Sequence, residues 1–249
     1  MSFSALMYHE IRTDETLNVD QPSPIKVRQT YEDQLPSVLF VRLKQFESQM
    51  AYLYEMDYHT LTLEEINNFY YKQIPLPGKS VLLTFDDCYQ SIQHYAYPIL
   101  KKYGFNAVAF VVTGWLNNAS IDFDPTQSIC LSEEALKQMS DVFDYANHTD
   151  QFHTRLNMNT NILMTSSHED FAADLDLCNQ KDIITAKDVF AYPFGLFNDA
   201  NVDTLKSNGF KLAFTSAGGV NLATTDPLLL NRFVVPHFMA LESFKEIIA

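Results

Sequence analysis

The sequence predicts a parallel α/β fold, either an open sheet or a barrel, in one domain over residues 1–249. Predicted strands and helices alternate along the chain, as is typical of a parallel sheet covered by helices. The chain shows no internal repeat and no low-complexity linker, and 47% of its 249 residues are hydrophobic. This length and composition suit a single α/β unit with a sizeable core.

The first half of the chain begins with a predicted short strand at 4–8, followed by a long polar loop at 12–36. Loops of this length often form part of a site or its rim. Residues 43–56 fit an amphipathic helix with one apolar side, formed by Phe46, Met50, Leu53 and Tyr54. Thr62 and Glu65 make a capping-box pattern that starts the next helix. The elements that follow are a buried strand at 81–85, a helix at 91–103 and a strand at 107–112.

Strands and helices continue to alternate in the second half. Ser132 caps a helix, and Glu133 and Glu134 lie in its first turn. Asn208 and Gly209 are a suitable stop for the helix at 199–207. The other predicted elements are strands at 142–146, 189–192, 211–215 and 228–235, and helices at 166–179 and 241–248.

Charge and cysteine content exclude several classes of protein. The net charge of −14 disfavours nucleic acids and anionic membranes and suits a neutral or cationic substrate. The three cysteines, Cys88, Cys130 and Cys178, are far apart and predict reduced thiols. No apolar stretch reaches the ~18 residues of a membrane span. The N-terminus has no signal-peptide pattern, so a cytoplasmic location is expected for the chain as written.

Asp86 and Asp87 directly follow the buried strand at 81–85. Two carboxylates at a partly desolvated strand end repel each other, and a metal ion would relieve that repulsion. One carboxylate could then bind the ion while the other accepts a proton. The alternative is that one of them caps the helix that follows.

His148 and His153 follow the predicted strand at 142–146. Imidazoles suit zinc, cobalt or nickel, and two histidines with one carboxylate leave positions open for water and substrate. A spacing of five does not place both rings on one face of a straight helix, so a loop entering a helical turn is expected. The alternative is two unrelated surface histidines.

Two further strand ends carry candidate residues. The turn Tyr192-Pro193-Phe194-Gly195 could present a backbone N–H to a developing oxyanion, or it could be an ordinary strand exit. His9, after the first strand, could be a general acid or a buried core histidine. His237, after the last strand, is the rival for the acid role. Because the chemistry of parallel α/β folds collects at the carboxyl ends of strands, these candidates are expected to meet.

In order and spacing, TFDDCYQS, NHTDQFH and AYPFG resemble the motifs of the polysaccharide deacetylase family, carbohydrate esterase family 4. Together with Met7-Tyr8-His9, the pattern is most similar to the poly-N-acetylglucosamine deacetylase branch. The resemblance implies a distorted (β/α) barrel of about seven parallel strands, circularly permuted so that the strand with the acid histidine comes first. It therefore favours His9 over His237.

The resemblance also implies an activity and a set of roles. The activity is metal-dependent hydrolysis of N-acetyl groups from an acetylated amino-sugar polymer, such as poly-N-acetylglucosamine, a chitin-like polymer or a peptidoglycan glycan, with release of acetate. Asp87, His148 and His153 would bind a divalent metal, with zinc favoured and cobalt or nickel possible alternatives. Asp86 would be the general base and His9 the general acid. The backbone N–H of Phe194, or of Tyr192, would face the oxyanion, and Tyr192 and Cys88 would lie beside the substrate.

The chain departs from the family pattern at two positions. Cys88 replaces a glycine that can serve an unusual backbone angle, and Ala191 replaces an arginine that orients the base. These departures motivate an alternative, a catalytically impaired carbohydrate-binding homologue that keeps the metal site. A metal amidase acting on a small acylated molecule is a third hypothesis. Related enzymes usually act outside the cytoplasm, in contrast to the location expected from the chain as written.

Overall fold

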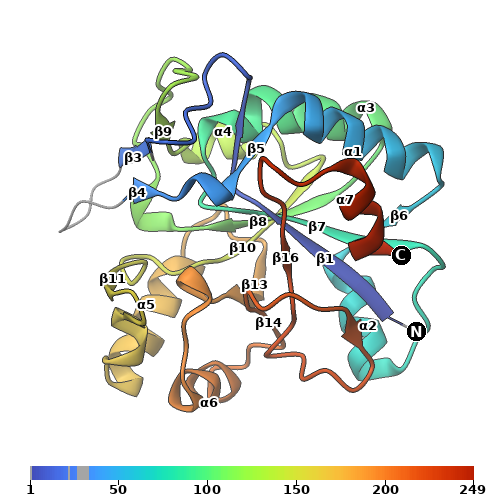
Figure 1. Ribbon diagram of the computed structural model, residues 1–249. Helices are drawn as coiled ribbons and strands as arrows, with labels where there is room; N and C mark the ends of the chain where they lie inside the picture. The colour runs from blue at the N-terminus through green and yellow to red at the C-terminus, as the bar shows by residue number, and fades with distance from the viewer. Residues whose placement is uncertain (1, 22, 27–33) are drawn as a thin grey trace.

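A computed structural model describes residues 2–21, 23–26 and 34–249. Its centre is a curled sheet in which seven parallel strands lie side by side (Figure 1). Their spatial order is β14 (Leu212–Phe214), β13 (Ala186–Ala191), β10 (Phe143–Asn147), β8 (Ala107–Val111), β7 (Ser80–Asp86), β1 (Ser2–Tyr8) and β16 (Phe233–Val234). The parallel pairing matches the α/β fold that the sequence predicts, and the number of strands matches the distorted barrel that the family resemblance implies.

Segment 227–235 connects the two ends of this sheet. The N–H of Thr215, after β14, donates to the carbonyl oxygen of Leu230, and the N–H of Val235 donates to that of Met7 in β1. The predicted strand at 228–235 is therefore mostly irregular, and only Phe233–Val234 is paired as a strand. β1, the first strand of the chain, lies between β7 and the last strand, β16, in the order that the permuted barrel requires.

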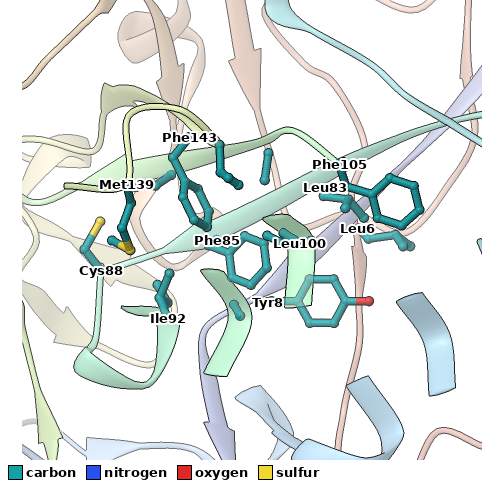
Figure 2. Packing of buried hydrophobic residues seen from close by; sticks show 14 of the residues in the cluster. Leu6, Tyr8, Leu83, Phe85, Cys88, Ile92, Leu100, Phe105, Met139 and Phe143 are labelled. Carbon is teal, nitrogen blue, oxygen red and sulfur yellow. The ribbon is translucent and has the colours of Figure 1, made fainter. Parts of the chain in front are cut away.

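Alternating side chains of the strands divide the core in two. In β7, Leu82 points to an inner cluster shared with the other strands, whereas Leu83 and Phe85 point to the outer helices. Figure 2 shows this outer cluster, in which the Tyr8 and Phe85 rings stack at 5.2 Å between centroids and Phe143 meets Phe85 edge-on. By the same alternation Asp86 faces inward, at the carboxyl end of the barrel.

Helices cover the outside of the sheet and its amino-terminal end. α1 (Leu43–Glu55), α3 (Tyr97–Tyr103), α4 (Glu133–Lys137) and α7 (Leu241–Ile248) supply residues to the outer cluster, and α5 (His168–Asn179) and α6 (Asp199–Ser207) pack together at the other side (Figure 1). α2 (Leu63–Lys72) starts at the predicted capping box of Thr62 and Glu65 and adds its apolar side to the inner cluster. None of the helices within the described ranges is long and apolar enough to cross a bilayer.

Three predictions about local structure need correction. Tyr54 is 59% exposed, so it does not share the buried side of α1 with Phe46, Met50 and Leu53. The predicted helix at 91–103 begins with a π-helical turn, Ile92–Ala96, before α3. The segment 12–36 is not only loop, since β2 (Glu10–Arg12) ends in it and β3 (Ser23–Lys26) and β4 (Gln34–Leu35) form a small sheet with β9 (Ser128–Ile129).

The remaining strands are short. β5 (Phe40–Arg42) pairs with β2, β6 (His59–Thr60) with the start of β7, and β15 (Asn221–Leu222) with the start of β1. A hairpin of β11 (Arg155–Asn157) and β12 (Thr160–Asn161) follows the second candidate histidine and leads into a 3-10 helix, Ile162–Met164.

Candidate active site

A cavity of about 250 Å³ lies at the carboxyl ends of the parallel strands. Five of the residues predicted at strand ends line it: His9, Asp86, Asp87, His148 and Phe194. Ile25, Leu35 and Pro36 of the segment expected to rim the site also line it, as do Val38 and Leu39 just after that segment. The cavity is thus lined both by acidic and histidine side chains, which can bind metals or transfer protons, and by apolar side chains.

Asp87, His148 and His153 come together in this cavity as a group that could hold a metal ion. All three are buried, and their candidate ligand atoms lie within 4.8 Å of one another. The Asp87 Oδ1 atom is 3.7 Å from His148 Nε2 and 3.5 Å from His153 Nε2. Two ligands of a tetrahedral ion, each about 2.0–2.2 Å from it, are themselves about 3.3–3.6 Å apart. Two imidazoles and a carboxylate at these separations fit one divalent ion.

Both histidines of this group are held in the neutral form that binds metals. Burial lowers the pKa of His148, and burial together with the nearby His148 lowers the pKa of His153. The His148 Nδ1 atom lies 2.7 Å from the carbonyl oxygen of Ala191, and a carbonyl can only accept. His148 therefore carries its proton on Nδ1 and presents Nε2 to the cavity.

Helix α5 holds the loop between these histidines through hydrogen bonds to the loop backbone. The Asp174 carboxylate accepts the backbone N–H of Asp150 at 2.9 Å and that of Gln151 at 2.7 Å. The Asp150 side chain in turn accepts the Thr113 hydroxyl at 2.6 Å. Thr149, beside His148, has a φ of +78°, which turns the chain at that point. This turn brings two histidines five positions apart to one place. The segment between them is loop, as predicted, but it lacks the helical turn that was also expected.

The end of β7 turns sharply after Asp86. Asp87 and Cys88 have φ values of +68° and +57°, in the region where glycine is the usual residue. The unusual backbone angle expected from a family glycine at this position is therefore present, with cysteine adopting it. The Cys88 side chain lies in the outer core with 0% exposure and does not line the cavity, which is at odds with the substrate contact predicted for it.

Asp86 is bound by an arginine that sequence reasoning missed. Arg232 Nη1 and Nη2 donate to the two carboxylate oxygens at 2.6 and 2.8 Å, and both side chains are almost fully buried. Burial alone would raise the pKa of Asp86, but Arg232, His9 and His148 outweigh it and lower that pKa. Asp86 is thus held by Arg232, and the cap positions of the helical segment that follows are Ser91 and Ala96, not the two aspartates.

Arg232 explains how the site manages without an arginine at position 191. Its guanidinium reaches Asp86 from the segment before β16, and it also contacts the Thr84 hydroxyl at 3.2 Å and the Thr215 carbonyl oxygen at 2.9 Å. The sequence carries a partial signal, since Arg232 is the one charged residue of the predicted strand at 228–235, but the signal does not show where that strand lies. A buried arginine requires an acidic partner, and Asp86 was a candidate.

His9, and not His237, lines the cavity. His9 Nε2 lies 3.8 Å from Asp86 Oδ2, whereas the His237 ring packs against Phe238. Burial lowers the pKa of His9 to about 4, against the opposing effect of Asp86. His9 is therefore neutral at neutral pH in the metal-free protein.

The turn after β13 differs from its prediction in one detail. The Tyr192 N–H donates to the Phe214 carbonyl oxygen at 3.0 Å, so it is not available to an oxyanion. The Phe194 N–H has no hydrogen bond to any residue in the described part of the chain, and Phe194 lines the cavity. Tyr192 also lines the cavity, but its hydroxyl donates to the Leu228 carbonyl oxygen.

Comparison with known proteins identifies the family of this chain. The family model for polysaccharide deacetylase matches residues 73–213. Poly-beta-1,6-N-acetyl-D-glucosamine N-deacetylase of Staphylococcus aureus is 32% identical over 221 residues, which cover 85% of this chain and 71% of that protein. The Staphylococcus epidermidis enzyme of the same name is 29% identical over 218 residues, covering 85% of this chain and 71% of that protein.

Solved structures of deacetylases share the fold over the whole chain. Streptococcus pyogenes deacetylase PplD, in complex with acetate, has a TM-score of 0.75 at 25% identity and covers 100% of this chain and 99% of its own. IcaB from Ammonifex degensii has a TM-score of 0.72 at 23% identity and covers 99% of this chain and 96% of its own. With a family model that spans more than half of its residues and curated relatives that match most of its length, the chain belongs to the polysaccharide deacetylase family.

Proposed function

We propose that this chain hydrolyses N-acetyl groups of a β-1,6-linked poly-N-acetylglucosamine, releasing acetate and leaving a free amine on the sugar. The observation that carries the proposal is the group of Asp87, His148 and His153 around one point, with Asp86 beside it and outside the ligand set. The polymer is inferred from the two staphylococcal relatives, which are N-deacetylases of that polysaccharide.

The metal is proposed to be zinc, bound by Asp87, His148 and His153. Neutral imidazoles and a carboxylate are frequent zinc ligands, and three protein ligands are typical of catalytic sites that keep a position open. Such an ion supplies Lewis-acid chemistry, lowering the pKa of water and polarising a carbonyl oxygen. Cobalt or nickel would suit the same donors.

Asp86 is proposed to be the general base. Arg232 holds both of its oxygens and lowers its pKa, so the carboxylate is ionised and fixed in orientation at neutral pH. It would accept the proton of the water molecule as that water attacks the acetyl carbonyl. The supporting distance is 4.0 Å between Asp86 Oδ2 and His148 Nε2, which places Asp86 next to the proposed ligands.

His9 is proposed to deliver the proton that the leaving amine needs. Because the pKa of His9 is lowered to about 4, His9 begins the reaction neutral and must be protonated within it. Asp86, 3.8 Å away, is the acid from which that proton would come. The proton taken from water would thus end on the sugar nitrogen as the C–N bond breaks.

Phe194 is proposed to stabilise the oxyanion through its backbone N–H. This donor faces charge that develops only as water adds to the carbonyl, which is where preorganised donors contribute most to the rate. Arg232 also weakens the case for an impaired homologue, since the guanidinium that position 191 lacks is supplied from the segment before β16.

Acetate release tests this proposal. The purified chain, loaded with zinc, is expected to release acetate from a β-1,6-linked N-acetylglucosamine oligomer faster than from N-acetylglucosamine itself. Equal rates on the monomer would favour the amidase of small molecules, and no release from any of these substrates would favour a binding protein.

A further inference from the structure

The turn that presents Phe194 has an unfavourable backbone conformation. Phe194 and Gly195 are consecutive residues with φ values of +61° and +66°. Gly195 adopts this at little cost, and a Cβ there would meet Ser216 Oγ at 1.8 Å. For a residue with a side chain, such as Phe194, the left-handed conformation costs about 1–2 kcal/mol. Contacts from outside the turn must therefore hold it.

The side chain of Asn161 supplies such contacts. Its Nδ2 atom donates to the carbonyl oxygens of Pro193 at 3.2 Å and Leu196 at 2.9 Å, the residues on either side of the left-handed pair. Its Oδ1 atom accepts the N–H of Met164 at 3.1 Å. Asn161 is completely buried, so water does not compete for these bonds. One amide group thus joins both ends of the turn.

Asn161 is itself fixed to the rest of the fold. It caps the 3-10 helix Ile162–Met164. Two asparagines of the α6 region bind the same helix: Asn198 Nδ2 donates to the Met164 carbonyl oxygen at 3.1 Å, and Asn201 Nδ2 to that of Leu163 at 2.7 Å. The turn is therefore tied, through Asn161, to an anchored element.

The same hairpin also contacts the Phe194 ring. Arg155 pairs with Asn161 across β11 and β12, and its guanidinium carbon lies 4.4 Å from the centre of the Phe194 ring. The His153 ring lies 4.4 Å from the same ring. The hairpin thus contacts the turn's carbonyl groups from one strand and its aromatic side chain from the other.

We propose that Asn161 is a positioning residue, which holds the Pro193–Leu196 turn in the conformation that directs the Phe194 N–H into the cavity. The conformational part stands on the hydrogen bonds above. The consequence for kcat rests on the proposed function, because it requires that the Phe194 N–H act on the oxyanion.

The test compares Asn161→Ser with the matched control Asn157→Ser in the same hairpin. Serine can still cap the 3-10 helix but is too short to reach the two carbonyl oxygens. Asn157 is exposed, and its side chain accepts the Asn159 N–H as its one hydrogen bond to the described residues. Hydrogen exchange is measured at Gly195 and Leu196, whose amides bond to Tyr192 and Pro193. Kinetics and zinc affinity are measured in parallel.

In Asn161→Ser, exchange at Gly195 and Leu196 is expected to be at least about tenfold faster, with the His148 amide unchanged. The value of kcat is expected to fall about 10- to 100-fold, less than the 10²–10³ typical when an oxyanion donor is removed outright. KM and zinc affinity should stay within about twofold, and Asn157→Ser should match the wild type. If the serine variant does not fold, Asn161→Asp keeps the size and the capping oxygen while removing both donated bonds.

Unchanged exchange at Gly195 and Leu196 would overturn the positioning role, whatever the activity. Faster exchange with an unchanged kcat would overturn its catalytic consequence, and a loss of zinc would show a general structural role instead. If the wild-type protein released no acetate, the proposed function would fail, while faster exchange in the variant would still support the positioning role.

Discussion

The guanidinium of Arg232 and the carboxylate of Asp86 form a buried, bidentate ion pair, with N–O distances of 2.6 and 2.8 Å. The partners are far apart in the chain and meet only because segment 227–235 crosses between the two ends of the curled sheet. The base and the group that orients it thus come from opposite halves of the sequence.

Removing Arg232 should affect both stability and the pH dependence of activity. Arg232→Met leaves a buried carboxylate unpaired, which typically costs about 3–5 kcal/mol in urea unfolding. Arg232→Lys keeps the charge but loses the planar pairing of two bonds. Since Arg232 lowers the pKa of Asp86, the acid limb of kcat/KM should move to higher pH in the lysine variant.

Arg42→Met is the control for that comparison. Arg42 pairs with Asp14 at 2.8 Å, but both side chains are more than a third exposed. Exposed pairs contribute about 0–1 kcal/mol, so this variant should unfold nearly as the wild type does and keep its pH profile. An unchanged acid limb in Arg232→Lys would contradict the role given to the Arg232–Asp86 pair.

Asp174 should affect metal affinity without touching the metal. Asp174→Asn can accept only one of the two backbone N–H groups of Asp150 and Gln151 that the carboxylate accepts, which loosens the loop between His148 and His153. Loss of such supporting contacts typically weakens metal binding 10- to 100-fold, measurable by competition with a zinc chelator. Asp176→Asn, exposed on the same helix, is the matched control and should bind zinc normally. Equal affinity in both variants would refute the support role.

His9 and His237 can be separated by activity. His9→Ala should lower kcat by on the order of 10²- to 10⁴-fold, because it removes the proposed proton donor to the amine. His237→Ala should leave kcat within about twofold, since His237 does not line the cavity. Acetate release under saturating substrate measures both. The reverse pattern would show that the strand order was misinterpreted.

His9 should also contribute to the pH dependence of stability in the metal-free protein. Its pKa is about 4 in the folded protein and 6.5 for an ordinary histidine in the unfolded chain, so between these values the unfolded chain binds the proton more readily. This contribution is present above pH 6.5 and is lost as the pH falls towards 4, to a total of about 3 kcal/mol. The free energy of unfolding, measured in urea on the chelator-treated protein, should therefore fall less between pH 7 and pH 4 in His9→Gln than in the wild type. An equal fall in the free energy of unfolding in the two proteins would contradict the burial of a neutral His9.

Much of the site could be predicted because its residues follow strands directly. Asp86, Asp87 and His148 lie at strand ends, and the carboxyl ends of parallel strands meet at one edge of a sheet. The position of each residue directly after a strand therefore predicted that residues far apart in the chain would meet. Arg232 was missed because its role depends on how segment 227–235 crosses between β14 and β1, and no local pattern encodes that crossing.

The remaining errors have similar causes. Tyr54 fits the apolar side of α1 by periodicity, but its ring contacts Tyr103 of α3 at the edge of the core and stays 59% exposed. Tyr192 and Phe194 are two residues apart and looked equivalent as oxyanion donors. The Phe214 carbonyl oxygen of the neighbouring strand uses the Tyr192 N–H, and only the paired sheet reveals this.

The most direct test of the account measures zinc content and acetate release together in wild type, Asp87→Asn and the control Asp188→Asn, whose partly exposed carboxylate pairs with Lys211 away from the cavity. The account predicts one equivalent of zinc and acetate release from the β-1,6-linked oligomer for the wild type and the control, and loss of both in folded Asp87→Asn. Undiminished acetate release by Asp87→Asn, or by wild-type protein stripped of metal, would contradict it.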